Sequence, residues 1–278
     1  MNLDALLSAE FSNLPEIVRC HAVMRPDAIA VADPEVRLTW AEFDMLGDRI
    51  AARLQREGVG PGRGVALAGF NSAHHVAVWL GVIRTGAVAG LITYSATGEQ
   101  MAAMIADTGA RHMFLDAGAA ATLAGFDLGD IQRIAMDGSD AGESLLQWMD
   151  PEGSVPEPVE IKPESGFNII YSSGTTGIPK GIVHSHAMRW QHIQRGLPAY
   201  GPDSVTILST PMYSNTTMAS FLPTIGSGGK IVLMKKFDAH GFLALAERER
   251  ATNTMLVPVQ YRRIMALPDF DSFDLSSF

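Results

Sequence analysis

Short apolar runs alternate with amphipathic stretches along most of this chain. Val65–Ala68 and Ala87–Ile92 have the length and composition of buried strands. Between these two runs, apolar side chains recur at helical spacing, at Val76, Trp79 and Ile83. Strands that alternate with helices of this length are typical of a parallel sheet with helices over its faces. The pattern therefore predicts an α/β fold with parallel or mixed sheets covered by helices.

Polar residues at expected helix starts support the same fold class. Thr39 with Glu42, and Thr97 with Gln100, stand three residues apart ahead of apolar stretches, which is the capping-box spacing. Asn13, which comes shortly before a proline, marks a further helix start. We therefore expect helices to begin just after Asn13, Thr39 and Thr97.

The stretch 150–165 interrupts the alternation, because it contains four prolines, five acidic residues and little apolar pattern. This composition is typical of a connector between subdomains, and equally of a long surface loop within one domain. We interpret it as a connector. The prediction is a first α/β subdomain at residues 1–160 and a second at residues 161–278.

A run of small residues stands between two apolar segments in the second half of the chain. Phe167 to Tyr171 is predicted to be a buried strand, and Ile182-Val183 to resume a strand. The residues Ser172 to Gly177 are only Ser, Thr and Gly, and Lys180 follows them. Glycines let the backbone approach a ligand closely, and hydroxyls donate to an oxyanion. Such donors with one cation at a strand end suit a polyphosphate.

Two other interpretations of this run are weaker. A Ser/Gly-rich stretch is often a flexible linker, but here we expect the strands on both sides to lie in the core and to anchor it. A Walker-type loop needs a lysine directly after its second glycine and then a helix. Ile178 and Pro179 precede Lys180, and a strand is expected to follow. A phosphate-binding loop of another kind is therefore favoured over a structural turn.

The run resembles the phosphate-loop signature of the adenylate-forming superfamily nearly residue for residue. That superfamily comprises acyl- and aryl-CoA synthetases, peptide-synthetase adenylation domains and luciferases. The matching residues are Tyr171-Ser172-Ser173-Gly174-Thr175-Thr176-Gly177-Ile178-Pro179-Lys180-Gly181.

A looser resemblance extends from about Pro26 to Phe278. Within it, Pro211-Met212-Tyr213 is similar to a second superfamily motif, in which the aromatic residue lies along the acyl substrate. Ser214 stands where relatives commonly carry a histidine. This departure puts in doubt any role that needs an imidazole there.

The resemblance implies an enzyme that joins a carboxylic acid to ATP, releases pyrophosphate and passes the acyl group from an acyl-adenylate to coenzyme A. It implies ATP, Mg²⁺ and coenzyme A as cofactors or co-substrates, with the metal ligands unknown. Lys180 is the candidate catalytic cation, and Tyr213, Ser214 and Asn215 are candidate substrate-binding residues. The candidate nucleotide-binding residues are Ser172, Ser173, Gly174, Thr175, Thr176, Gly177 and Lys180.

The resemblance also implies that this chain corresponds to the N-terminal large domain of such an enzyme, truncated at its C-terminal end. In the superfamily, the adenine- and ribose-binding residues, a magnesium-binding acid and a mobile domain with a catalytic lysine follow the position of Phe278. We therefore expect little turnover from this chain alone, and exposed apolar surface that favours self-association. The alternative is a non-catalytic nucleotide-binding or interaction module of the same fold.

Composition narrows the expected partners and location. The net charge is −9, and Lys and Arg cluster only in pairs such as Lys235-Lys236, which argues against nucleic acid. A single cysteine, Cys20, excludes an internal disulfide and fits a reducing cytoplasm. The most apolar span, Val76–Tyr94, contains Arg84 and three glycines, so a helix followed by a strand is favoured over a membrane span.

Two histidines follow the loop at strand spacing, His184 and His186. Such a pair can ligate zinc, but no third ligand stands nearby. We expect His184 to pack in the core and His186 to open a helix. The sequence leaves open which acid is used, whether the acceptor is coenzyme A or a carrier-protein thiol, and the oligomeric state.

Overall fold

The computed structural model describes residues 2–172 and 179–278. Within these residues the strands form one sheet of five strands and one of seven. Each sheet is the centre of a compact unit. The five-stranded unit comprises Met1–Phe43, Asn71–Ala73 and Trp190–Phe278, and the seven-stranded unit comprises Asp44–Phe70 and His74–Arg189.

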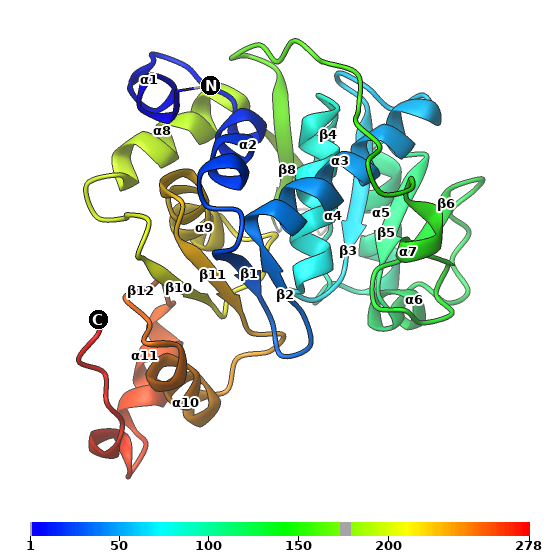
Figure 1. The fold of residues 1–278 in the computed structure, drawn as a ribbon. Coiled ribbons are helices and arrows are strands. Elements are labelled where there is room, and N and C mark those ends of the chain that lie inside the picture. The colour runs from blue at the N-terminus through cyan, green and yellow to red at the C-terminus, as the bar shows by residue number, and fades with distance from the viewer. Residues whose placement is uncertain (1, 173–178) are drawn as a thin grey trace. The chain divides into compact units, whose positions relative to one another are not determined.

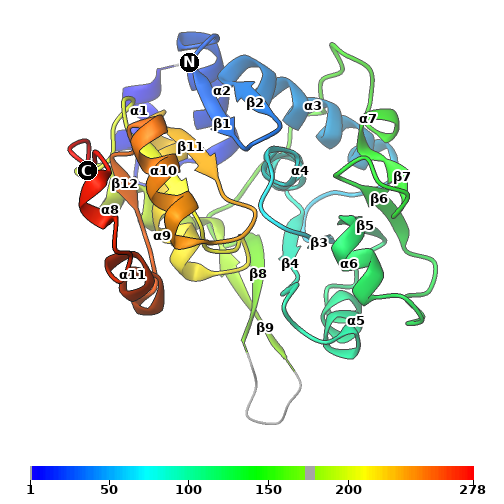
Figure 2. The ribbon, with the colours of Figure 1, turned by 90° about the horizontal axis from the view of Figure 1, so that it is seen from below.

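The sheet of the seven-stranded unit has the strand order β7-β6-β5-β3-β4-β8-β9 (Figure 1). All neighbouring strands run parallel except β8 and β9, which are antiparallel. Figure 2 shows β8 and β9 running side by side as a hairpin. The strands are β3 (Gly64–Ala68), β4 (Val88–Leu91), β5 (His112–Leu115), β6 (Gln132–Ala135), β7 (Glu143–Ser144), β8 (Gly166–Ser172) and β9 (Lys180–Ser185).

Alternate residues of these strands pack against helices on opposite faces of the sheet. In β5, Met113 and Leu115 join an apolar cluster with Met104 of α5, whereas Phe114 between them contacts the ring of Trp148 in α7. The helices of this unit are α3 (Trp40–Arg56), which begins in the five-stranded unit, α4 (Ala73–Arg84), α5 (Gly98–Asp107), α6 (Ala117–Thr122) and α7 (Leu145–Trp148).

Helices α3 and α4 approach each other closely around a buried ion group. The guanidinium of Arg84 donates to Asp44 Oδ1 at 2.6 Å and to Asp48 Oδ1 at 2.7 Å. A Cβ on Gly81 would lie 2.5 Å from Ile50 Cγ2, so only glycine permits this helix spacing. Because removing one partner of a buried ion pair leaves an uncompensated charge, this group fixes the pairing of the two helices.

The sheet of the five-stranded unit has the order β12-β10-β11-β1-β2, parallel except for the antiparallel pair β1 and β2. Its strands are β1 (Ile29–Ala32), β2 (Arg37–Thr39), β10 (Val205–Leu208), β11 (Lys230–Leu233) and β12 (Asn253–Thr254). Its helical segments are α1 (Leu3–Ser8), α2 (Leu14–Met24), α9 (Asn215–Ser227), α10 (Ala239–Glu249), α11 (Pro258–Met265) and the 3₁₀ turn Phe270–Ser272. Helix α8 (His186–Gly196) leads from one unit into the other.

Helices α9 and α10 cover opposite faces of the five-stranded sheet. In β10, Thr206 Oγ1 lies 2.7 Å from Thr224 Oγ1 of α9. The next residue, Ile207, packs in a cluster with Phe242 of α10. This period-two alternation buries both faces, as expected for a largely parallel sheet.

The expected helix starts are confirmed by side-chain hydrogen bonds. Glu42 Oε2 accepts from Thr39 N at 2.8 Å, and Thr39 Oγ1 accepts from Glu42 N at 3.2 Å. Thr97 and Gln100 form the same reciprocal pair at the start of α5. Asn13 caps α2 by accepting from the backbone N–H of a residue in its first turn.

The predicted subdomain boundary at residue 160 does not follow the two units. It falls inside the seven-stranded unit, because β8 beyond it pairs with β4 before it. The Pro-rich stretch 150–165 also lies wholly in this unit. Its Glu157 backbone N–H and C=O both bond to the side-chain amide of Gln55 in α3, at 2.8 and 2.9 Å.

The expectation that both strands beside the small-residue run are buried is wrong for the second one. Residues Phe167 to Tyr171 of β8 are at most 8% exposed, whereas Ile182 and Val183 of β9 are 48% and 61% exposed. The reason is position: β9 is the outermost strand of the sheet formed by the described residues. An outermost strand lacks the cover that a central strand receives.

No helix within the described ranges combines the length and apolar character that a bilayer span requires. The apolar span beginning at Val76 is instead divided between α4 and β4.

His184 and His186 are both buried, and His186 is the first residue of α8. The imidazole of His186 meets the Phe167 ring edge-on, with ring centroids 4.9 Å apart. Burial lowers the pKa of His186 from its ordinary 6.5 to about 4. The imidazole is therefore neutral in the folded protein at neutral pH.

Lowering the pH from about 6.5 to about 4 should destabilise the fold through His186. In that range the unfolded chain binds a proton at this residue and the folded chain does not, so the free energy of unfolding falls by up to about 1.4 kcal/mol per pH unit. Urea unfolding at a series of pH values would measure the slope for the wild type and for His186→Gln. We expect a shallower slope in the variant, and identical slopes would contradict this assignment.

Candidate functional site

The candidate phosphate loop connects two antiparallel strands of the seven-stranded unit. Strand β8 ends at Ser172, strand β9 begins at Lys180, and these two residues face each other in register. Both are exposed. The structure therefore brings Ser172 and Lys180 together at the mouth of the loop. The other predicted donors, Ser173, Gly174, Thr175, Thr176 and Gly177, lie outside the described residues, and their roles stay predictions.

Tyr171 anchors the strand that enters the loop. Its side chain is buried, and its hydroxyl lies 2.9 Å from the carbonyl oxygen of Met104 and 3.0 Å from Asp107 Oδ2. Burial, together with the hydrogen bond and the charge of Asp107, raises the pKa of Tyr171. The phenol therefore stays protonated and donates toward the end of α5.

Gly181 lies in the strand that leaves the loop, at a position with little room for a side chain. It faces Tyr171 in register, and a Cβ built on it would lie 2.8 Å from Asp107 Oδ2 and 2.9 Å from Ile169 Cγ2. A side chain at this position would require Asp107 or Ile169 to shift, so the close approach favours glycine. Asp107 therefore lies beside both strands that flank the loop.

Asp107 was not identified by the sequence analysis. It lies at the end of α5, 64 residues before Tyr171, and no local motif marks it. Its place beside the strands that flank the loop becomes visible only when β8 and β9 are paired next to α5.

The described part of the loop region contains one cation and one hydroxyl that could meet a ligand. These are the ammonium of Lys180 and the hydroxyl of Ser172, at positions that face each other across the two strands. Across the ranges that the structure describes, no three His, Cys, Asp or Glu side chains gather to hold a metal ion. The predicted loop itself contains no carboxylate. Its donor set suits phosphate oxygens, and the magnesium ligands remain unassigned.

The second predicted motif lies in the five-stranded unit, after the carboxyl end of β10. Open α/β sheets bind ligands at the carboxyl ends of their strands. Tyr213 and Ser214 are half-buried and Asn215 is exposed. Ser214 also caps α9, because its Oγ accepts from Thr216 N at 3.2 Å. Its hydroxyl proton remains available as a donor to a carboxylate.

A buried asparagine that the sequence analysis missed holds this motif in place. Asn71 is 5% exposed, and its Nδ2 donates to the carbonyl of Thr210 at 2.9 Å. Its Oδ1 accepts from the backbone N–H of Met212 at 3.1 Å. The signal that could have found it is its place three residues after β3, since polar residues at strand ends often serve a site.

Thr217, in the first turn of α9, supports the same turn. Thr217 Oγ1 donates to the carbonyl of Pro211 at 2.6 Å and lies 2.7 Å from Thr210 Oγ1. Together with Asn71, these contacts give hydrogen-bond partners to three backbone groups of the turn before Tyr213. They are the carbonyls of Thr210 and Pro211 and the N–H of Met212. Buried hydrogen bonds of this kind give a rigid loop with one conformation.

The chain is similar to known ligases over most of its length. The chain is 30% identical over 277 residues to the indoleacetate–CoA ligase of Aromatoleum aromaticum, covering 95% of this chain and 53% of that protein. It is 29% identical over 259 residues to the feruloyl-CoA synthase of an Amycolatopsis species, covering 92% of this chain and 51% of that protein. The chain thus spans about half the length of the curated relatives it matches.

Solved structures confirm the predicted α/β fold of an adenylate-forming N-terminal domain. The inhibitor-bound N-terminal domain of FACL13 from Mycobacterium tuberculosis superposes with a TM-score of 0.83 at 26% identity, covering 96% of this chain and 68% of that one. Residues 18–278 match the family described as AMP-binding enzyme. The predicted membership of the adenylate-forming superfamily is therefore confirmed, and this chain belongs to the AMP-binding enzyme family.

Proposed function

We propose that this chain is the nucleotide- and acid-binding part of a ligase that activates a carboxylic acid with ATP and transfers the acyl group to coenzyme A. The observation that carries the proposal is the family signature at residues 171–181, whose entering strand is bonded to Asp107 through the Tyr171 hydroxyl. The names of the relatives, a CoA ligase and a CoA synthase, support the same reaction class.

The proposed first step forms a mixed anhydride. A carboxylate oxygen of the acid attacks the α-phosphorus of ATP, the bond from that phosphorus to the bridging oxygen breaks, and pyrophosphate leaves. Negative charge grows on the departing pyrophosphate, so fixed donors that meet it lower the barrier. Ser172, Ser173, Thr175 and Thr176 are the proposed hydroxyl donors, and Lys180 is the proposed cation. Magnesium would neutralise further phosphate charge when bound.

The proposed second step consumes the acyl-adenylate. The thiolate of coenzyme A attacks the acyl carbonyl carbon, the bond to the phosphate oxygen breaks, and AMP leaves. The acid is proposed to lie against Tyr213, with Ser214 and Asn215 supplying hydroxyl and amide donors to its carboxylate. A hydroxyl at position 214 replaces the imidazole common in the superfamily, so carboxylate recognition here is proposed to be insensitive to histidine titration.

The reaction is tested by pyrophosphate release from the full-length gene product. A panel of aromatic and fatty acids with Mg-ATP and coenzyme A should give release that depends on the acid. Omitting the thiol should leave acyl-adenylate formation intact. Release that never depends on an added acid would reject the ligase and favour a non-catalytic nucleotide-binding module.

Removing one loop hydroxyl should weaken nucleotide binding. Thr176→Val deletes a donor to a charged phosphate, and such bonds are worth about 1.5–3 kcal/mol, so we expect the Kd for Mg-ATP to rise about tenfold or more. Isothermal titration measures this directly. Thr122→Val is the matched control, because that hydroxyl donates to the carbonyl of Gly118 in its own helix. Equal affinity in Thr176→Val and the wild type would remove Thr176 from the site.

Removing the hydrogen bond between β8 and α5 should also weaken nucleotide binding. Tyr171→Phe keeps the ring and removes the hydroxyl contacts to Met104 and Asp107, so we expect a loss of about 1 kcal/mol of stability and a severalfold rise in the Kd for Mg-ATP. Urea unfolding and titration measure the two effects separately. Tyr200→Phe, at a half-buried tyrosine of the five-stranded unit, serves as the control. A stability loss with unchanged ATP affinity would show that Tyr171 supports the fold alone.

A further inference from the structure

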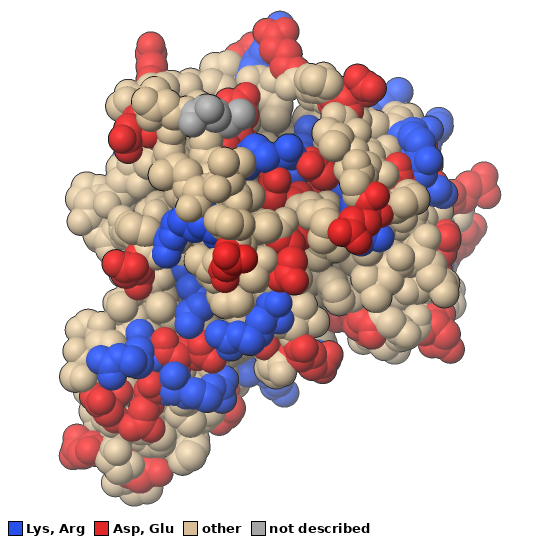
Figure 3. All heavy atoms as spheres, in the orientation of Figure 1, with Lys and Arg blue, Asp and Glu red and all other residues tan. Residues whose placement is uncertain are grey.

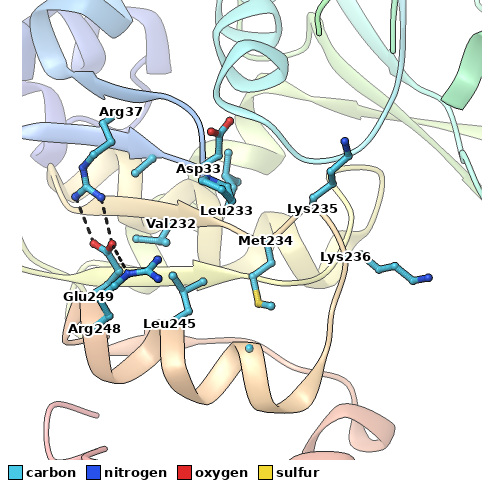
Figure 4. Close-up of a pocket in the computed structure, with 13 residues that line it drawn as sticks. Asp33, Arg37, Val232, Leu233, Met234, Lys235, Lys236, Leu245, Arg248 and Glu249 are labelled. Carbon is cyan, nitrogen blue, oxygen red and sulfur yellow. Dashed lines mark hydrogen bonds and ion pairs between the residues drawn. The ribbon is translucent and has the colours of Figure 1, made fainter. Parts of the chain in front are cut away.

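A cavity of about 400 Å³ opens in the five-stranded unit between the sheet and α10 (Figure 4). Its apolar part comes from Ala32 of β1, Val232 of β11 and Leu245 of α10, which are 1%, 2% and 9% exposed. Pockets that bind small organic molecules have volumes from about 300 Å³ upward and mostly apolar walls. None of Tyr213, Ser214 and Asn215 lines it. The cavity is therefore of ligand size and separate from the motif proposed to hold the acid substrate.

The two acidic side chains that line the cavity are already committed to protein donors. Glu249 accepts from Arg37 at 3.1 and 3.3 Å and from Lys230 at 2.9 Å. Burial would raise the pKa of Glu249, but the hydrogen bonds from Arg37 and Lys230 outweigh it and lower the pKa to about 2. Asp33 accepts from three backbone N–H groups at 2.7 to 2.8 Å. Neither carboxylate is a ready acceptor for a cationic ligand.

Basic side chains outnumber the acids around the cavity. Arg37, Lys235, Lys236 and Arg248 line it, against Asp33 and Glu249. The side chain of Arg248 is 66% exposed, and its Nε lies 3.5 Å from Glu249 Oε1. Figure 4 shows the Arg248 guanidinium beside Glu249 and facing the space between Val232 and Leu245. In Figure 3, Lys and Arg side chains gather over the same region, beside α10, on a chain whose net charge is −9.

We propose that this cavity binds an amphipathic organic anion, with its apolar body against Val232 and Leu245 and its carboxylate or phosphate head at Arg248. The inference goes beyond the proposed ligase reaction, because it assigns a second ligand site in the five-stranded unit. Arg37 and Lys230 pair with Glu249 at 2.9 to 3.3 Å, closer than Arg248 does at 3.5 Å, so the exposed Arg248 guanidinium is the more weakly committed cation and is assigned to the ligand charge. A local cation can attract an anion even when the whole chain is negative.

The ligand chemistry is tested by isothermal titration with octyl phosphate and octanoate. Inorganic phosphate supplies the head without the apolar body, and octanol supplies the body without the charge. We expect both amphipathic anions to bind, and both partial ligands to bind at least about tenfold more weakly, because each lacks one of the two contacts. Inorganic phosphate that binds as tightly as octyl phosphate would overturn the role of the apolar wall. Octanol that binds as tightly as octanoate would overturn the role of the cation.

The location of the ligand is tested by reversing the charge of two basic residues that line the cavity, Lys236 and Arg248. Lys236→Glu/Arg248→Glu should weaken octyl phosphate binding about tenfold, and the neutral Lys236→Gln/Arg248→Gln should weaken it less. Arg262→Glu/Arg263→Glu is the matched control, since both arginines are exposed on α11 and make the same change in net charge. Wild-type affinity in Lys236→Glu/Arg248→Glu would place the ligand elsewhere. Thr176→Val should leave this binding unchanged, so a failure of the ATP assignment and a failure of this one are distinguishable.

Discussion

The position of Asp107 beside both strands that flank the candidate phosphate loop is the constraint around which the site is built. The carboxyl group receives the Tyr171 hydroxyl at 3.0 Å, and it lies where any side chain on Gly181 would have to be. Tyr171 precedes the loop and Gly181 follows it. One residue on α5 therefore binds the strand that enters the loop and limits the side-chain space on the strand that leaves it. A hydrogen bond to a charged group is worth about 1.5–3 kcal/mol, so the Tyr171 bond contributes measurably to this arrangement.

Long-range polar contacts of the same type hold together segments that are far apart in the chain. Asn71 joins the turn after β10, Arg84 joins α3 to α4, and His21 Nε2 lies 3.0 Å from the carbonyl of Gly226 in α9. Each of these groups is buried, and a buried polar group without its partner is costly. The pairing of elements inside each unit is therefore specified by a few contacts as well as by apolar packing.

The positions of helices and strands could be predicted from the sequence better than the tertiary contacts that those helices and strands make. Thr39, Thr97 and Asn13 marked helix starts because capping is local and its signal lies within four residues. The exposure of Ile182 and Val183 could not be read from their apolar character, because burial depends on which strands lie alongside.

The residues of the candidate site also fall into two groups, those that the sequence could indicate and those that only the structure shows. The loop residues could be proposed from the sequence because small donors stand together in the run 172–177. Asp107 and Asn71 could not, since each acts through a contact with residues distant in sequence. Sequence patterns indicate the local structure of a segment, whereas the contacts between distant segments become visible only in the folded chain.

The position of Lys180 has a consequence for how accurately the hairpin must form. Side chains alternate faces along a strand, so a slip of one residue would move Lys180 by about 3.3 Å and turn its ammonium to the other side of the sheet. The exposed Ile182 and Val183 resist such a slip weakly. Gly181 opposes it, because a slip of one residue would place the side chain of Lys180 or Ile182 where Asp107 lies. The glycine therefore helps to fix the register of β8 and β9, and with it the face of the sheet on which Lys180 lies.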